Sequence, residues 1–361
     1  MAGSISSALL LLLNMAGALL APRAPHSLPA TDDEGVDFFF FPFLVLYKSG
    51  RVERFMGTDT VPASVDPATG VASKDVVIDA AAGLAVRLYL PNCTAGRDEK
   101  KLPLVVFYHG GAFVTESAFS PTYQRYLNAL VSKAGVVAVS VDYHLSPERR
   151  LPTAYDDAWT VLRWALRSAR SGAAEPWLSR RADLTRLFLV GDSAGGNIAH
   201  NMAMRAGREG LDGGATIQGI ALLDPYFWGK HPVPSETQDQ AARRWRDRTW
   251  SFVCAGRYGV DDPVINPVAM ERHEWRRLGC ARVLVTVAGL DMLAARGRAY
   301  VGALGASGWG GEVRLYETPG ENHVYFLLKP DGEKAAKEME AVVAFINGKT
   351  HSLENQESVA G

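Results

Sequence analysis

Short apolar runs alternate with longer amphipathic stretches over most of the chain. Most of the later runs are apolar nearly throughout, which is typical of strands buried on both faces of a parallel sheet. These runs are residues 104–108, 136–141, 187–190, 219–223, 283–287 and 313–316. Two earlier runs, 76–78 and 85–90, predict antiparallel strands, and the stretches 155–169 and 196–205 predict crossover helices. Strands that alternate with helices predict an α/β fold, with a mostly parallel sheet covered by helices on both faces.

Two regions break this alternation. Residues 228–277 are rich in Trp, Arg, Asp and Pro and contain no β run, so we predict an insertion over the carboxyl edge of the sheet. Residues 38–60 precede the sheet with amphipathic spacing and are expected to complete the same cap. Helical spacing over 334–346 predicts a last helix that Gly348 ends.

These patterns divide the chain into three parts. We expect a leader or disordered extension over 1–36, one α/β domain over 37–348, and a disordered tail over 349–361. Within the domain, the cap is expected to comprise about 37–60 and 228–277.

The first thirty residues contain an apolar run as long as the core of a secretory signal, but too short and interrupted to span a bilayer. Residues 2–13 contain no Lys or Arg, and Pro22 follows the most obvious cleavage point after Ala21. We therefore expect an extension on a cytoplasmic protein, with secretory or organelle targeting as the alternative. The sequon that starts at Asn92 would accept a glycan only on the secretory route.

Charge and cysteine content exclude several classes of function. The 361 residues carry 38 Lys and Arg against 39 Asp and Glu, a net charge of −1, which argues against nucleic acid as a partner. A mean hydropathy of −0.03 argues against a multi-span membrane protein, and we expect no stable membrane insertion. Cys93, Cys254 and Cys280 are too few and too scattered for a disulfide scaffold or a closed zinc site. The oligomeric state is not readable from these features.

The segment Gly191-Asp192-Ser193-Ala194-Gly195 is a G-x-S-x-G pattern between an apolar run and a helical stretch. The terminal glycines permit a strained turn that presents the hydroxyl of Ser193 above the sheet. The helix that follows places backbone N–H groups where a negative charge develops on a bound carbonyl oxygen. The alternative is a glycine-rich helix N-terminus that turns the chain or binds a phosphate.

The segment His109-Gly110-Gly111 directly follows the run 104–108. Two consecutive glycines let backbone N–H groups turn toward a substrate oxyanion with no Cβ in the way. We expect the N–H groups of Gly110 and Gly111 to act together with that of Ala194 as an oxyanion hole. The alternative is an ordinary tight turn between a strand and a helix.

A serine nucleophile needs a histidine base, and the base needs a carboxylate that orients it. In α/β-hydrolase folds the chain order is Ser, acid, His, each after a strand. Asp291 follows the run 283–287, and His323 follows 313–316. The spacings from Ser193 to Asp291 and from Asp291 to His323 are 98 and 32 residues. Of the eight histidines, only His323 follows the last strand in this order.

With these motifs, residues 37–348 resemble the plant carboxylesterases of the hormone-sensitive-lipase group of α/β hydrolases, a group that also contains the gibberellin receptors. The resemblance also rests on residues 143–148 with 155–158, which are similar to the group's YRLAPE…DD signature, and on 75–79 and 224–228.

The resemblance implies a nucleophilic serine, a histidine that acts as base and then acid, and a carboxylate that orients it: Ser193, His323 and Asp291. It implies oxyanion donors at Gly110, Gly111 and Ala194, and neither a metal nor an organic cofactor. Ala112 stands where the group has a third glycine, and its methyl group is expected to narrow the acyl pocket.

The expected function is that of a serine carboxylesterase that hydrolyses short-to-medium acyl esters of small molecules through an acyl-enzyme. One alternative is a 2-hydroxyisoflavanone dehydratase-like or transesterifying enzyme on the same site. Another is a non-catalytic, gibberellin-receptor-like binding protein, which the presence of His323 disfavours because those receptors lack this histidine. A long-chain lipase is disfavoured because the Trp-rich cap is densely charged.

Overall fold

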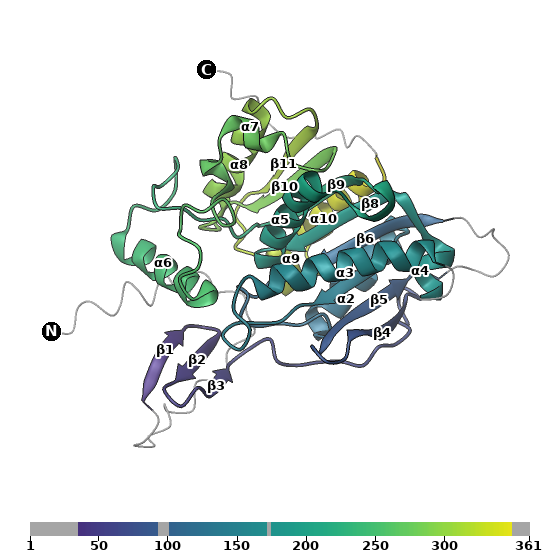
Figure 1. Cartoon of the computed structure of the whole chain (residues 1–361), viewed down its shortest axis with the longest axis horizontal. Coiled ribbons are helices and arrows are strands. Elements are labelled where there is room, and N and C mark those ends of the chain that lie inside the picture. The colour runs from purple at the N-terminus through teal and green to yellow at the C-terminus, as the bar shows by residue number, and fades with distance from the viewer. Residues whose placement is uncertain (1–34, 93–100, 172–174, 349–361) are drawn as a thin grey trace.

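The computed structural model describes residues 35–92, 101–171 and 175–348. An eight-stranded sheet crosses the molecule in the order β11-β10-β9-β8-β6-β7-β5-β4 (Figure 1). Its strands are β4 (Ala72–Asp79), β5 (Leu84–Leu90), β6 (Leu102–Tyr108), β7 (Val137–Asp142), β8 (Ala182–Asp192), β9 (Ile217–Leu223), β10 (Arg282–Ala288) and β11 (Glu312–Thr318). Every neighbouring pair from β7 to β11 is parallel, whereas β5 pairs antiparallel with both β7 and β4. The predicted mostly parallel α/β sheet is confirmed.

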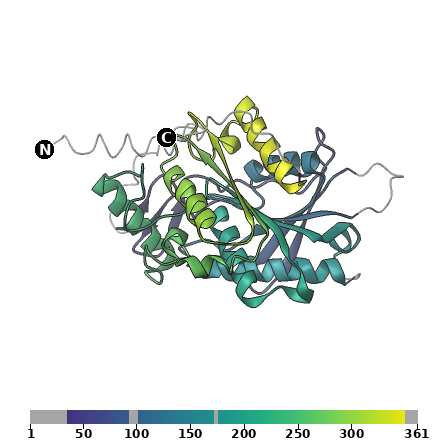
Figure 2. The same cartoon turned by 90° about the horizontal axis from the view of Figure 1, so that it is seen from above.

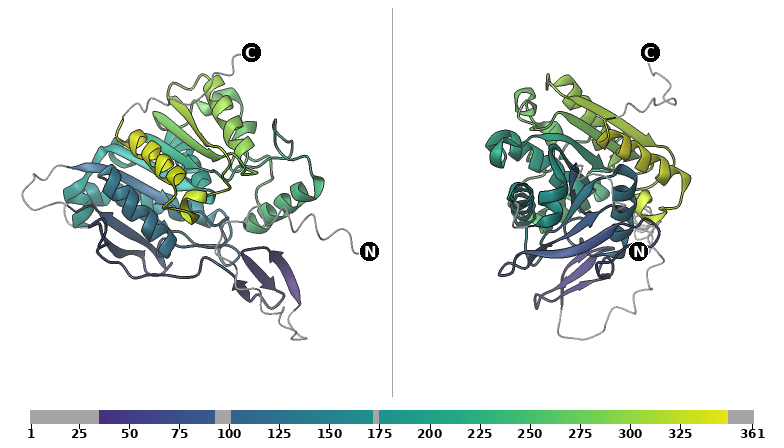
Figure 3. Two further views of the ribbon diagram at one scale, coloured as in Figure 1. Left: turned by 180° about the vertical axis from the view of Figure 1, so that it is seen from behind. Right: turned by 90° about the vertical axis from the view of Figure 1, so that its right-hand side faces the viewer.

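Helices cover both faces of this sheet (Figure 2). One face packs against α3 (Thr153–Arg170), α5 (Ala194–Glu209) and α8 (Ala294–Ala306), and the other against α2 (Pro121–Ala134) and α10 (Glu333–Ile346) (Figure 3). Successive residues of β6 alternate between the two cores: Leu104 and Val106 belong to the first, Val105 and Phe107 to the second. Burial on both faces explains why these strands are apolar throughout.

The remaining helices are short. They are α4 (Pro176–Arg181), α7 (Arg272–Trp275), α9 (Tyr325–Leu328) and the 3₁₀ turns η1 (Asp212–Gly214) and η2 (Pro267–Ala269). In the described ranges, no helix combines the length and the hydropathy that crossing a bilayer requires. Most of the predicted leader, residue Cys93 and the predicted tail lie outside the described residues.

Two segments that are far apart in the sequence lie side by side at one end of the molecule (Figure 1). One is a small antiparallel sheet of β1 (Val36–Phe40), β2 (Leu44–Tyr47) and β3 (Val52–Arg54), and the other is helix α6 (Gln240–Cys254). Phe38 of β1 stacks on Phe252 and Trp245 of α6, with ring centroids 4.2 and 6.0 Å apart. The amphipathic spacing of residues 38–60 therefore belongs largely to strands whose aromatic side chains pack against a helix.

Candidate active site

Ser193 lies in the turn between β8 and α5, with φ 51° and ψ −116°. This left-handed φ is uncommon for a residue with a side chain, and it marks a strained turn. Neither neighbouring glycine could carry a Cβ, because one on Gly195 would collide with the carbonyl oxygen of Tyr108 and one on Gly191 with the backbone of Gly195. The G-x-S-x-G pattern is therefore required by close backbone packing, and it leaves the Ser193 side chain on the wall of a cavity.

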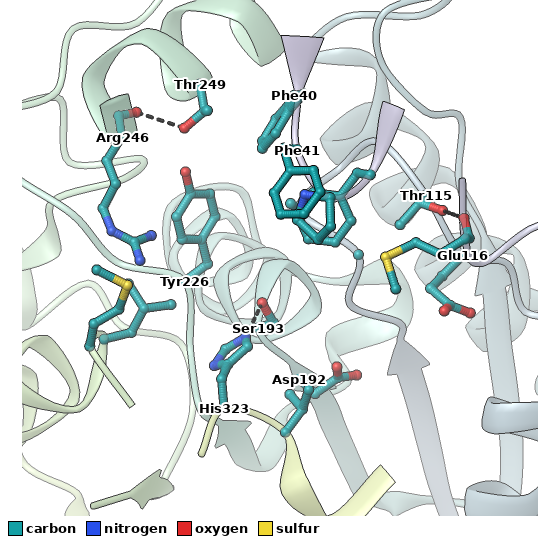
Figure 4. A pocket seen from close by; sticks show the side chains of 18 of the residues that line it. Phe40, Phe41, Thr115, Glu116, Asp192, Ser193, Tyr226, Arg246, Thr249 and His323 are labelled. Carbon is teal, nitrogen blue, oxygen red and sulfur yellow. Dashed lines mark hydrogen bonds between the residues drawn. The ribbon is translucent and has the colours of Figure 1, made fainter. Parts of the chain in front are cut away.

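The three residues predicted as a catalytic triad lie together. His323 Nε2 is 2.9 Å from Ser193 Oγ, and His323 Nδ1 is 2.7 Å from Asp291 Oδ2. Figure 4 shows Ser193 and His323 facing each other at the bottom of the cavity. The three residues follow β8, β10 and β11, and the carboxyl ends of these parallel strands meet at one edge of the sheet. When the imidazole is neutral, the Ser193 hydroxyl donates to Nε2, and Nδ1–H donates to the carboxylate.

Carboxylates surround His323. Burial alone would lower the pKa of the imidazole, but Asp291, followed by Asp224 and Asp192, outweighs burial and raises the pKa of His323 to about 9. Burial also raises the pKa of the Asp192 carboxyl to about 7, against the opposing effect of a hydrogen bond from Tyr123. The site therefore favours the protonated form of its histidine.

The loop after β6 is tied to the nucleophile turn through Tyr123 of α2. Gly110 N–H donates to Tyr123 Oη at 2.7 Å, and this hydroxyl donates to Asp192 Oδ2 at 2.9 Å. Here the structure differs from the expectation, because the N–H of Gly110 is already engaged and faces the helix instead of a substrate. The sequence around Tyr123 carries no signal of this role.

The next residues of the loop leave donors available. Within the described residues, the N–H groups of Gly111, Ala112 and Ala194 have no protein acceptor, and both loop residues line the cavity. Gly111 has φ 97°, and a Cβ there would collide with the carbonyl oxygen of Thr115. Ala112 has φ 53°. Because Gly111 and Ala112 have left-handed φ values, their N–H groups do not enter the hydrogen-bond pattern of a strand or a helix.

The cavity beside Ser193 has a volume of about 730 Å³. Most of its wall is aromatic or aliphatic and comes from the small sheet, from α6 and from α9. Residues of these three elements include Phe39, Phe40, Trp245 and Leu327. Among the ionisable side chains that line it, Glu116 and Arg246 lie on different sides of the cavity (Figure 4). The cavity suits a mostly apolar small molecule.

Buried charges hold the cap side of the cavity. Glu236 is fully buried and pairs with Arg243 of α6 at 3.2 Å and with Arg296 of α8 at 3.0 Å. Both guanidinium groups also lie over the ring of Trp228, at 4.5 and 5.9 Å from its centroid. These pairs connect α6 to a helix that packs on the main sheet.

One group of side chains has the composition of a metal site. Ligand atoms of Asp224, Asp291 and His323 lie within 4.8 Å of one another. However, both ring nitrogens of His323 are engaged by Asp291 and Ser193. The carboxylate of Asp224 accepts the N–H groups of Ala288 and Val324. Hydrogen bonds therefore account for this cluster without an ion.

Comparisons with known proteins agree with this fold. A family with the alpha/beta hydrolase fold matches residues 105–327. The chain is 45% identical over 319 residues to "Probable carboxylesterase 13" of Arabidopsis thaliana, covering 86% of this chain and 97% of that protein. It is 44% identical over 328 residues to "Tuliposide A-converting enzyme 2, chloroplastic" of Tulipa gesneriana, covering 91% and 83%.

Among solved structures, a thermostable esterase from Pseudomonas putida superposes with a TM-score of 0.63. The match has 24% sequence identity and covers 80% of this chain and 86% of that one. This likeness supports the fold.

Proposed function

The chain belongs to the α/β-hydrolase family and, within it, to the plant carboxylesterases, and on this premise we propose that it is a serine carboxylesterase for short-to-medium acyl esters of small molecules. The observation that carries the proposal is the hydrogen-bonded series Ser193–His323–Asp291, with distances of 2.9 and 2.7 Å. A serine that donates to a buried imidazole, itself held by a carboxylate, has the arrangement that nucleophilic acyl transfer needs.

The reaction proceeds in two halves. Ser193 Oγ attacks the ester carbonyl carbon while His323 Nε2 takes the hydroxyl proton, and Asp291 stabilises the resulting imidazolium. The tetrahedral intermediate collapses, the C–O bond to the alcohol breaks, and the imidazolium gives its proton to the departing oxygen. Water then attacks the acyl-enzyme with His323 again as base, and the acid leaves as Ser193 regains its proton.

For the oxyanion we propose the N–H groups of Gly111, Ala112 and Ala194. This differs from the set expected from the sequence, because Gly110 donates to Tyr123. The methyl group of Ala112 does not prevent its N–H from donating. Each oxyanion donor contributes about 3 kcal/mol to transition-state stabilisation.

The cavity supports a small-molecule ester as substrate. Its volume of about 730 Å³ is that of a typical small-molecule site, and its wall is largely aromatic. Cap residues from the small sheet and α6 close over Ser193, so we propose that the cap segments, about 37–60 and 228–277, set the choice of acyl and alcohol groups.

The test is hydrolysis of p-nitrophenyl esters from acetate to laurate by the wild type and by Ser193→Ala. Removing the nucleophile is expected to lower kcat by about 10⁶-fold. Ser307→Ala is the matched control, since Ser307 is also buried but its hydroxyl contacts only the backbone of Leu304 and Trp309 among the described residues, and it should keep wild-type rates. Equal inertness of the wild type and Ser193→Ala, with tight binding of a hormone, would instead support a receptor. Rates that peak at laurate would support a lipase.

A second candidate is transesterification, which the 44% identity to a tuliposide A-converting enzyme favours. In transesterification a hydroxyl group of the substrate, in place of water, would attack the acyl-enzyme. Turnover in ¹⁸O-labelled water separates the two: hydrolysis puts the label into the released acid, whereas transesterification leaves the product unlabelled. Incubation with a 2-hydroxyisoflavanone tests the dehydratase alternative, because elimination of water yields the isoflavone.

For location, we propose a cytoplasmic enzyme, with organelle targeting as the alternative that the chloroplastic tulip relative favours. Residues 1–36 fused to a fluorescent protein test this proposal. Diffuse cytoplasmic fluorescence supports it, and accumulation in plastids contradicts it.

A further inference from the structure

A second aspartate lies beside the base. Asp224 directly follows β9 and is 2% exposed. It belongs to the group whose ligand atoms lie within 4.8 Å of one another, together with Asp291 and His323. The mechanism above assigns no role to this carboxylate, although a buried charge next to an imidazole affects its basicity.

The hydrogen bonds of Asp224 connect the two loops that carry the acid and the base. Its Oδ1 accepts the N–H of Ala288 at 2.8 Å, and its Oδ2 accepts the N–H of Val324 at 2.7 Å. Ala288 is the last residue of β10, just before the loop of Asp291, and Val324 directly follows His323. One side chain therefore sets the separation of the acid loop from the base loop.

The backbone conformation of Val324 makes its hydrogen bond to Asp224 more important for the geometry of the site. Val324 has φ 48°, which is a strained conformation for a β-branched residue. Such a conformation persists only where surrounding contacts hold it. The hydrogen bond to Asp224 is one such contact, and it directly adjoins the catalytic imidazole.

Electrostatics give Asp224 a second effect. The charged groups that face it are Asp291, Glu338 of α10 and His323. Burial, followed by repulsion from Asp291 and Glu338, raises the pKa of Asp224, while attraction to His323 lowers it. Two carboxylates this close ionise together only with difficulty. Loss of the charge on Asp291 would thus favour the charge on Asp224.

We propose that Asp224 is a second carboxylate for His323: a positioning residue that holds the base loop against the acid loop and stabilises the imidazolium, and that partly replaces Asp291 when its charge is removed. This inference rests on the proposed function, because it concerns the same histidine. It predicts that the two aspartates are energetically coupled.

The experiment is a double-mutant cycle of wild type, Asp291→Asn, Asp224→Asn and the double variant. Removing the acid of a triad typically costs about 10⁴-fold, but here Asp291→Asn should cost about 10²-fold. Asp224→Asn should cost about tenfold in the wild type and at least about 10²-fold in the Asp291→Asn background. The readouts are kcat/KM for p-nitrophenyl butyrate and the rate at which a fluorophosphonate labels Ser193, each measured from pH 5 to 10.

A structural role alone would not move the pH profile. We expect Asp224→Asn to shift the midpoint for His323 downward by about one pH unit, since it loses a neighbouring negative charge. NMR titration of the His323 ring measures the same shift without any substrate. Asp157→Asn is the matched control: Asp157 is also a buried carboxylate that accepts two N–H groups, here the backbone N–H and the Nδ1–H of His144. It should leave the midpoint unchanged.

The outcomes separate the two proposals. An equal factor for Asp224→Asn in both backgrounds, or an unchanged His323 midpoint, overturns the role of Asp224. If the wild type and Ser193→Ala hydrolyse the ester and react with the fluorophosphonate equally, the proposed function is overturned. The NMR titration still decides in that case whether Asp224 acts on His323.

Discussion

The two walls of the cavity are built in different ways. The sheet-edge wall consists of the nucleophile turn, the loop after β6 and the loops of Asp291 and His323, all directly attached to strands and joined by short hydrogen bonds. The cap wall consists of the small sheet and α6, which are joined by aromatic stacking, and α6 is held to α8 by the buried pairs of Glu236. The positions of the reacting groups thus depend on the backbone, whereas the shape of the cavity that selects the substrate depends on side-chain packing.

The largest expected effect tests the cap wall. Glu236→Gln leaves Arg243 and Arg296 without their buried counter-charge and should lower the free energy of unfolding by about 3–5 kcal/mol. Urea denaturation measures this loss. Asp331→Asn, which removes an exposed partner of Arg125, is the control and should cost less than about 1 kcal/mol. Similar losses for both variants would mean that buried charge does not hold the cap.

The next effect tests the sheet-edge wall. Gly111→Ala places a methyl group against the carbonyl oxygen of Thr115 and displaces a proposed oxyanion donor, so kcat should fall by about 10²–10³-fold. Gly50→Ala is the matched control. Gly50 also has a positive φ, but a Cβ there would meet no atom within 4 Å. It should lower stability by about 1 kcal/mol and leave kcat unchanged. A normal kcat in Gly111→Ala would remove this loop from the mechanism.

The pH dependence of kcat/KM is expected to come from the sheet-edge wall, which carries His323. In the proposed mechanism only the neutral imidazole of His323 accepts the serine proton, and the pKa of His323 is raised to about 9. As pH falls below 9 the base becomes protonated, so kcat/KM should fall about tenfold for each unit, or about 50-fold between pH 9 and pH 7. Burial lowers the pKa of His109 to about 4, so that ring stays neutral over this range. A plateau already reached at pH 7 would contradict the prediction.

The smallest effect concerns a single aromatic contact of the cap. Trp245→Ala removes a ring that stacks on Phe38 and lines the cavity. We expect KM for p-nitrophenyl hexanoate to rise about tenfold, which corresponds to about 1.4 kcal/mol, with kcat for the acetate unchanged. Trp177→Ala, on α4 away from the cavity, should alter neither constant. A loss of kcat without a change in KM would mean that the two walls are not separable.

The sequence was most informative where the backbone determines the geometry. Chain order was sufficient to group Ser193, Asp291 and His323, because parallel strands end at a common edge. The apolar runs predicted the sheet because strands buried on both faces tolerate few polar residues. Helix α2 was not predicted, although Pro121 at its first turn is a recognisable start signal.

The sequence was least informative where side chains from distant elements meet. Nothing near Gly110 indicates that Tyr123 of α2 takes its N–H. Nothing near Asp224 indicates that β9 delivers it to His323. The pairing of the small sheet with α6 also depends on stacking between residues about two hundred positions apart. Such contacts follow from tertiary packing, which local patterns do not encode.

The order of the triad in the chain has a consequence for biosynthesis. Ser193 precedes His323 by 130 residues, and translation proceeds from the N-terminus, so folding begins there. The nucleophile turn and the oxyanion loop are therefore synthesised well before their base. On the proposed mechanism, a nascent chain that stops short of β11 has a serine without an imidazole to activate it, so ester cleavage would start only after this strand has emerged from the ribosome and joined the sheet.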